Sequence, residues 1–166
     1  MPTQSGSTQT SRPRAALALL GWLALCFAVT AASLTIDAHG IAWYAGLIKP
    51  PLNPPGWLSA PASITLTALM AISVWLVWRT RPSTCRRKGL RLFGVTLWFN
   101  LLWSWIFFSR HQIGTALVDL VVLLVAILLT IVNFRKVSTT AAWMMVPYLV
   151  WVGFAIYLNL AFWRLN

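Results

Sequence analysis

The sequence has few charged residues and almost no acidic ones. Only 9% of its 166 residues are Asp, Glu, Lys or Arg, and just two are acidic. A water-soluble domain carries about 25% charged residues. With 59% hydrophobic residues and a mean hydropathy of +0.75, the chain lacks the polar groups needed to cover a surface facing water. It is therefore predicted to lie in a membrane.

Motifs for metal binding and for common enzyme chemistry are also missing. Cys26 and Cys85 have no CxxC partner and no nearby histidine, which argues against a metal site and a disulfide framework. The chain has no G-x-S-x-G, no glycine-rich phosphate loop, no HExxH and no carboxylate pair. No catalytic residue, metal ligand or obligatory cofactor is predicted.

Basic residues greatly outnumber the two acids. Thirteen Lys and Arg give a formal net charge of +11. In a soluble protein this excess would indicate nucleic-acid binding. Here most of the basic residues fall in short segments between apolar runs, where they set membrane topology and contact anionic headgroups. The lipid bilayer, and not nucleic acid, is the predicted partner.

Five apolar runs are long enough to cross a bilayer, which takes about 20 residues. They predict an all-α, five-helix transmembrane bundle as a single domain over 15–166. The expected helices cover residues 15–36, 57–78, 90–109, 113–134 and 141–163. Residues 1–14 are polar and read as a disordered tail. The competing reading of 15–36 is a signal peptide, but the run exceeds the usual h-region of about 7–15 residues.

The basic residues are distributed unevenly between the two sides of this bundle. Five spans place the tail, the segment 79–91 and the segment 135–140 on one side. That side carries Arg12, Arg14, Arg79, Arg81, Arg86, Arg87, Lys88, Arg91, Arg135 and Lys136. The other side has only Lys49, Arg110 and Arg164. The positive-inside rule predicts a cytoplasmic N-terminus and an external C-terminus.

The stretch at 43–57, WYAGLIKPPLNPPGW, connects the first two spans. Because proline fixes φ and lacks an N–H group, this stretch is not expected to span the membrane as a helix. We predict a stiff connection, edged by Trp43 and Trp57, that closes the mouth of a small-molecule pocket.

Two predicted helices each present an aromatic ring beside an amide on one face. The face on 90–109 comprises Asn100, Trp103, Ser104 and Phe107. The face on 141–163 comprises Tyr148, Trp151, Ala155 and Asn159. An amide is not satisfied by lipid tails, so both faces should point into the bundle. They would suit a flat hydrophobic ligand with polar edges, or else serve helix packing with the asparagines bonded to each other.

Asp119 is placed inside the fourth span. Acids within membranes are costly, face the interior and often mark function. The alternative is a structural role, as a hydrogen-bond partner or as a pair with His111 or Arg110. A proton relay needs more than one such group, and no second acid falls within any predicted span.

Several motifs in order resemble those of the translocator protein family, also called tryptophan-rich sensory proteins or peripheral benzodiazepine receptors. They are WYAGLIKPPLNPP at 43–55, LWFNLLWSWIFF at 97–108, ALVD at 116–119, PYLVWVGFAIYLN at 147–159 and WRLN at 163–166. The resemblance covers the chain from about residue 20 to its end.

This resemblance implies a five-helix membrane protein, usually a homodimer, that binds porphyrins and haem-type tetrapyrroles as a receptor, sensor or transporter. The alternative is a membrane enzyme that degrades bound porphyrin oxidatively or photochemically; a scaffold for other membrane proteins is a third reading. By position, Trp43, Asn100, Trp151 and Ala155 match family pocket residues. Lys49 and Pro50 belong to the segment expected to cap the pocket.

The chain departs from the family pattern on one wall. Leu52, Ser59, Ser63 and Thr67 stand where aromatic residues are common, and Thr96 replaces a frequent glutamine. Each missing ring would remove about 0.5–1.5 kcal/mol of stacking beyond plain burial. The sterol motif of the last helix is broken as well, because Leu160 stands where it needs a tyrosine. Cholesterol binding is not expected.

Overall fold

A computed structural model describes residues 12–166, which form five long helices and contain no strand. The elements are α1 (Arg12–Gly46), α2 (Gly56–Trp78), α3 (Thr84–Ser104), the π-helical turn η1 (Trp105–Ser109), α4 (Ile113–Arg135) and α5 (Thr139–Leu165). All five long helices are apolar enough to cross a membrane. The predicted all-α, five-helix membrane fold is confirmed.

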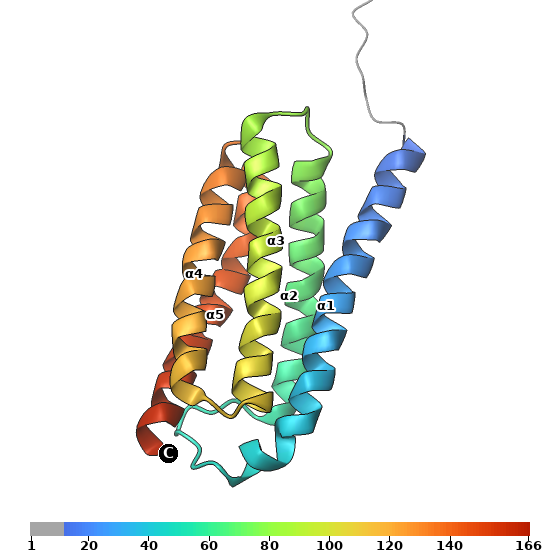
Figure 1. Cartoon of the computed structure of the whole chain (residues 1–166). Coiled ribbons are helices and arrows are strands. Elements are labelled where there is room, and N and C mark those ends of the chain that lie inside the picture. Colours follow the sequence, from blue (N-terminus) through green and yellow to red (C-terminus); the bar gives the residue numbers. More distant parts are fainter. Residues whose placement is uncertain (1–11) are drawn as a thin grey trace, which may run out of the picture.

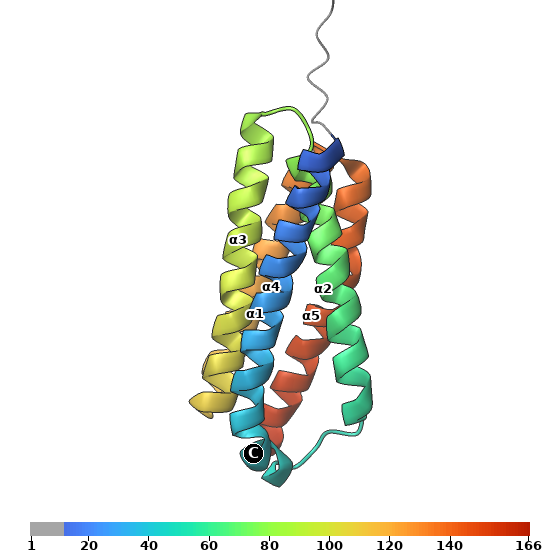
Figure 2. The ribbon, with the colours of Figure 1, turned by 90° about the vertical axis from the view of Figure 1, so that its right-hand side faces the viewer.

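The helices form a closed ring in which neighbours run antiparallel, except for α1 and α3, which run parallel (Figures 1 and 2). In this ring α1 contacts α2 and α3, α2 contacts α5, and α4 lies between α3 and α5. The N-terminal end of α1 stands apart from the other helices in Figure 1. There the Trp75 indole of α2 bridges the gap, donating to the Ala15 carbonyl at 2.8 Å. The ring therefore closes least tightly along α1.

Helix α1 extends well beyond the expected range of 15–36 and ends at Gly46. The polar residues that follow Ile36 form hydrogen bonds without breaking the helix. The imidazole Nδ1 of His39 donates to the Thr35 carbonyl at 2.6 Å, and Asp37 accepts a hydrogen bond from Ser104. The expectation of a non-helical stretch from Trp43 onward was therefore wrong for residues 43–46. The expected tail at 1–14 lies outside the described residues except for 12–14, which are helical.

Helix α3 also begins earlier than residue 90. Ser83 adopts an extended conformation and its side chain accepts from the Arg86 backbone N–H at 3.1 Å, a typical N-cap. Basic residues 86–88, expected in a loop, therefore lie in the first turns of the helix. The bounds of α2, α4 and α5 differ from the expected ranges by at most two residues.

The centre of the bundle is held by rings and hydroxyl groups between neighbouring helices. Phe93 of α3 stacks on Phe134 of α4 with centroids 6.2 Å apart. The Ser73 hydroxyl of α2 donates to the Ala141 carbonyl of α5 at 2.7 Å, and both residues are fully buried. Buried hydroxyl groups need such partners where no water competes. These contacts keep α2, α3, α4 and α5 in fixed register around the interior.

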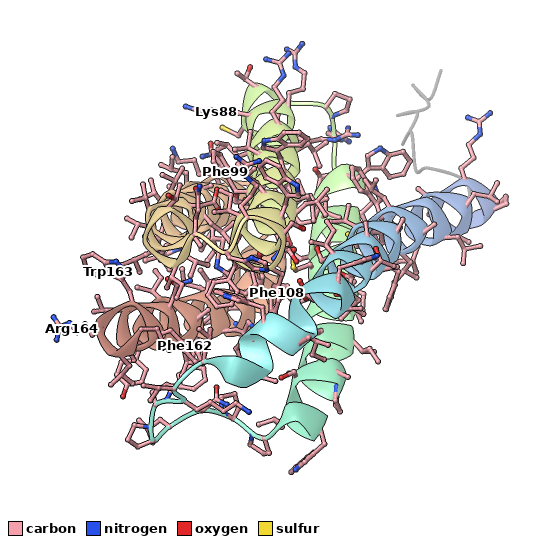
Figure 3. All side chains as sticks on the ribbon, turned by 60° about the horizontal axis from the view of Figure 1, so that its bottom comes forward. Lys88, Phe99, Phe108, Phe162, Trp163 and Arg164 are labelled. Carbon is pink, nitrogen blue, oxygen red and sulfur yellow. The ribbon has the colours of Figure 1, made fainter. Side chains whose placement is uncertain are left out.

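Near its C-terminal end, α1 approaches η1 at a glycine. A Cβ atom added to Gly40 would lie 2.5 Å from the carbonyl oxygen of Phe108. Figure 3 shows Phe108 beside this part of α1. Only a residue without a side chain fits this separation. Gly40 thus fixes where the lower part of α1 meets the bundle.

Candidate functional site

A cavity of about 120 Å³ lies between α1, α2, α3 and α5. Each of these four helices contributes a separate part of the wall. The lining residues are Cys26, Val29, Thr30, Ser33, Leu34, Asp37, Ser63, Leu66, Thr67, Met70, Leu97, Asn100, Trp103, Ser104, Tyr148 and Trp151. The wall therefore combines apolar surface with hydroxyl groups, one amide and one carboxylate.

Helices α3 and α5 supply the aromatic part of the wall. The Asn100 amide donates through Nδ2 to the Tyr148 hydroxyl at 3.0 Å. The rings of Trp103 and Trp151 line the same cavity. Five of the residues on the two predicted faces are thus brought together: these four and Ser104. The two asparagines are not bonded to each other, because Asn100 is paired with Tyr148.

Helices α1 and α3 supply a polar part, of which the sequence analysis named Ser104 of α3 but not the residues of α1. The Ser104 hydroxyl donates to the carboxylate of Asp37 and lies 3.3 Å from the Ser33 carbonyl oxygen. Asp37 is half-buried and lines the cavity. It is a second acid within a helix that can span the membrane. The expectation that no second acid lies in a span was therefore wrong.

A signal for this polar face is present in the sequence. Cys26, Thr30, Ser33 and Asp37 recur at three- and four-residue intervals, so they share one side of a helix. The expected end of the helix at residue 36 hid the pattern, because Asp37 was placed in a loop.

Helix α2 faces this polar side with hydroxyl groups. Thr67 Oγ1 and Thr30 Oγ1 share a hydrogen bond of 2.8 Å, which joins α1 to α2. Ser63 also lines the cavity. Ser63 and Thr67 are two of the positions where the resemblance in the sequence led us to expect aromatic residues. Because their side chains are small and polar, this wall of the cavity offers hydroxyl groups and no aromatic ring.

The rings of Trp43 and Phe107 lie in a second cluster and do not line the cavity. Trp43 stands 5.5 Å from Phe107 and 4.4 Å from the His111 ring, centroid to centroid. Phe107 in turn stacks on Trp103 at 5.5 Å. This cluster supports the cavity from the C-terminal end of α1, through Trp103.

The connection at 47–55 is fastened to the end of the bundle. Asn166 binds both the N–H and the carbonyl group of Ile48, at 2.9 and 3.3 Å. The Tyr44 hydroxyl donates to the Asn53 side chain at 2.9 Å. Pro50 is buried, whereas Lys49 is exposed with its Nζ 5.8 Å from the Tyr44 ring. Neither lines the cavity in this structure, so their role as a cap stays a prediction.

The remaining expected site residues, Asp119, Ala155 and Asn159, are placed away from the cavity lining. Ala155 packs against the main core. Asp119 and Asn159 are 6% and 2% exposed. Asp119 Oδ2 and both Asn159 amide atoms have no partner among the described residues. Arg110 lies over the Trp105 ring and His111 on Trp43, so neither reaches Asp119 as an ion-pair partner in the described chain.

Known proteins resemble this chain over most of its length. The model of the TspO/MBR family matches residues 14–164. The tryptophan-rich protein TspO of Chlorobaculum tepidum is 38% identical over 149 residues, covering 87% of this chain and 92% of that protein. The human translocator protein is 38% identical over 133 residues, 79% of each chain. Protein CrtK of Rhodobacter capsulatus is 38% identical over 126 residues, 75% of this chain and 79% of that protein. The chain belongs to the TspO/MBR family, as the order of its motifs predicted.

Proposed function

We propose that this membrane protein is a receptor, sensor or transporter for a flat hydrophobic ligand of the porphyrin or haem type. One observation carries the proposal: the rings of Trp103, Tyr148 and Trp151 converge on one cavity beside the Asn100 amide. Pockets for small molecules combine mostly apolar and aromatic walls with a few fixed polar groups. Relatives named translocator protein and tryptophan-rich sensory protein support a role in handling a molecule at the membrane.

A tetrapyrrole requires the cavity to widen. Its volume of about 120 Å³ is below the roughly 300–1,000 Å³ of pockets that bury drug-sized ligands. Helix α1 is the wall that can move at the lowest cost. In its most apolar stretch only 6% of residues are buried, against 28–39% in the other four helices. Binding would therefore displace α1 outward, breaking the Thr30–Thr67 hydrogen bond.

Titration of the purified protein with protoporphyrin IX tests this proposal. Saturable quenching of tryptophan fluorescence is expected, with weaker binding in Trp151→Ala. Trp98→Ala is the matched control, because Trp98 is 64% exposed on the outside of α3 and should leave the affinity unchanged. Equal affinity in all three proteins would exclude the cavity as the site. A chain that only scaffolds other membrane proteins would show no saturable quenching.

We also propose that the end of the bundle carrying residues 79–83 and 136–138 faces the cytoplasm, as the basic residues favour. Cys85 lies at this end and is partly exposed, whereas Cys26 is buried. A membrane-impermeant maleimide should label Cys85 in inverted vesicles and spare it in right-side-out vesicles. Leu52, 61% exposed at the opposite end, supplies the control as Leu52→Cys in a Cys85→Ser background. Labelling of Cys85 in right-side-out vesicles would show that the bundle has the opposite orientation.

A further inference from the structure

The cavity contains one charged side chain, and that side chain is an acid. The chain carries thirteen basic residues and only two acidic ones, yet the lining includes Asp37 and no Lys, Arg or His. Carboxylates within a membrane are costly unless something compensates their charge. The position of Asp37 is therefore the feature of this cavity that most needs an explanation.

The protein supplies only part of that compensation. Among the described residues, Asp37 accepts one side-chain hydrogen bond, from Ser104 to its Oδ1. An ionised carboxylate has two oxygens and about four acceptor positions. The second oxygen thus retains its full capacity to accept from a bound group. No basic residue in the described chain forms an ion pair with Asp37.

The other groups around the cavity are those that bind organic cations. The faces of tryptophan and tyrosine rings attract ammonium groups, and such rings form the known cages for methylated amines. Trp103, Tyr148 and Trp151 provide three rings opposite the helix that carries Asp37. Ser33 Oγ is buried without a partner among the described residues and is a free acceptor on the same face as Asp37. A carboxylate and three rings together favour a positive group over a neutral one.

The size and opening of the cavity indicate the shape of such a ligand. A volume of about 120 Å³ suits a compact head group better than a whole drug-sized molecule. Leu34 lines the cavity and is 49% exposed, so the cavity reaches the outer surface of the bundle beside α1. An apolar tail could leave along this route and lie against α1 and the lipid.

We propose that this cavity binds the cationic head of an amphipathic amine, with Asp37 as its counter-ion and Trp103 and Trp151 as its aromatic walls. The inference rests on the cavity of the proposed function and specifies its preference: ligands with positive groups bind better than neutral ones.

Two probes of equal shape test the charge preference. The cationic probe is 2-(2-naphthyl)ethyl-trimethylammonium, whose charge does not depend on pH, and the neutral probe is its tert-butyl isostere. Dissociation constants are measured by calorimetry on the full-length protein in a nonionic detergent. The wild type should bind the cationic probe at least about tenfold more tightly than the neutral one. The buried carboxylate and the cation–π contacts increase the affinity only for the charged head group.

Asp37→Asn should reduce this preference several-fold, to what the rings alone contribute, since the amide keeps the shape and the acceptor for Ser104 but loses the charge. Ser104→Ala should retain the preference, because it removes a hydrogen bond and leaves the carboxylate. Equal binding of both probes by the wild type would overturn the proposal, as would absence of binding. A preference that survives Asp37→Asn undiminished and disappears in Asp119→Asn would overturn it too.

Comparing the binding of protoporphyrin IX with that of the two probes separates this inference from the proposed function. If protoporphyrin IX binds in a Trp151-dependent manner while the two probes bind equally, the cavity assignment stands and the cation assignment falls. If the wild type distinguishes the probes but does not bind the porphyrin, the cation site stands and the porphyrin proposal falls.

Discussion

The indole of Trp43 stacks on the imidazole of His111 with ring centroids 4.4 Å apart and an angle of 29° between the planes. This contact joins the end of α1 to the bend between η1 and α4. His111 has a positive φ of 54° at that bend, a conformation that residues with a Cβ seldom adopt. The stack and the bend together set the position of the second aromatic cluster beneath the cavity.

Two substitutions at His111 separate the bend from the stack. Asparagine tolerates the left-handed conformation, whereas a β-branched residue does not. Both His111→Asn and His111→Val lose the ring contact with Trp43. We expect Val to lower the free energy of unfolding by about 1–2 kcal/mol more than Asn does. Unfolding in detergent, followed by circular dichroism, measures the difference. Equal values would show that the backbone at residue 111 is unstrained.

Replacing glycine by alanine should have opposite effects on stability at two positions of α1. Gly40→Ala would place a Cβ 2.5 Å from the Phe108 carbonyl oxygen, so α1 must move away from η1. We expect a loss of about 1–3 kcal/mol, as in other overpacked interfaces. Gly21→Ala meets no atom within 4 Å and should be neutral or stabilise the helix by up to about 1 kcal/mol. Thermal unfolding of the two variants measures both effects, and equal midpoints would contradict the close approach.

The hydrogen bond between Asn100 and Tyr148 should contribute to stability as well as shape. Tyr148→Phe removes the acceptor of Asn100 Nδ2 inside the bundle. The expected cost is about 0.6 kcal/mol, the average for side-chain hydrogen bonds within membranes, and at most about 1.7 kcal/mol. Tyr157→Phe is the control, because Tyr157 is 44% exposed and should be silent. An equal midpoint of unfolding for Tyr148→Phe and wild type would show that this bond adds nothing.

Substituting a buried polar residue should change stability differently depending on whether its side chain has a hydrogen-bond partner. Asn159 is 2% exposed and lacks a partner among the described residues. Asn159→Leu removes these unpaired amide atoms and should leave stability unchanged or raise it. Ser73→Ala should lower it by about 1 kcal/mol, because the hydroxyl is bonded to the Ala141 carbonyl. A large loss of stability in Asn159→Leu would show that the amide holds a ligand or a structural partner.

The positions of the five helices could be predicted because an apolar run can adopt few backbone structures within a bilayer. Backbone groups in hydrocarbon must be satisfied within the segment, so a run of about 20 apolar residues becomes a helix. The aromatic–amide faces of α3 and α5 were equally readable, since α5 and the part of the third span up to Ser104 keep the α-helical period, which the π-helical turn η1 then interrupts before Phe107. For that reason Asn100, Trp103, Tyr148 and Trp151 were named before the cavity was known, and they meet there.

The end of α1 could not be predicted in the same way. Hydropathy falls at Asp37, and a reading based on apolar runs stops there. In the structure the helix continues to Gly46, and Asp37 within it accepts a hydrogen bond from Ser104, a residue 67 positions away. Trp43 was likewise expected near a ligand, but its place depends on Phe107 and His111, which the chain brings to it only after folding.

The sequence by itself determined the membrane class, the five helices, the family and the aromatic half of the cavity, because each depends on local composition, local motifs or the helical period. Only the tertiary structure decided the polar half. The pairings of Asp37 with Ser104 and of Thr30 with Thr67 join different helices, and no local pattern shows which residues will face each other. Those contacts put a carboxylate beside the tryptophans, and with it the charge preference proposed for this cavity.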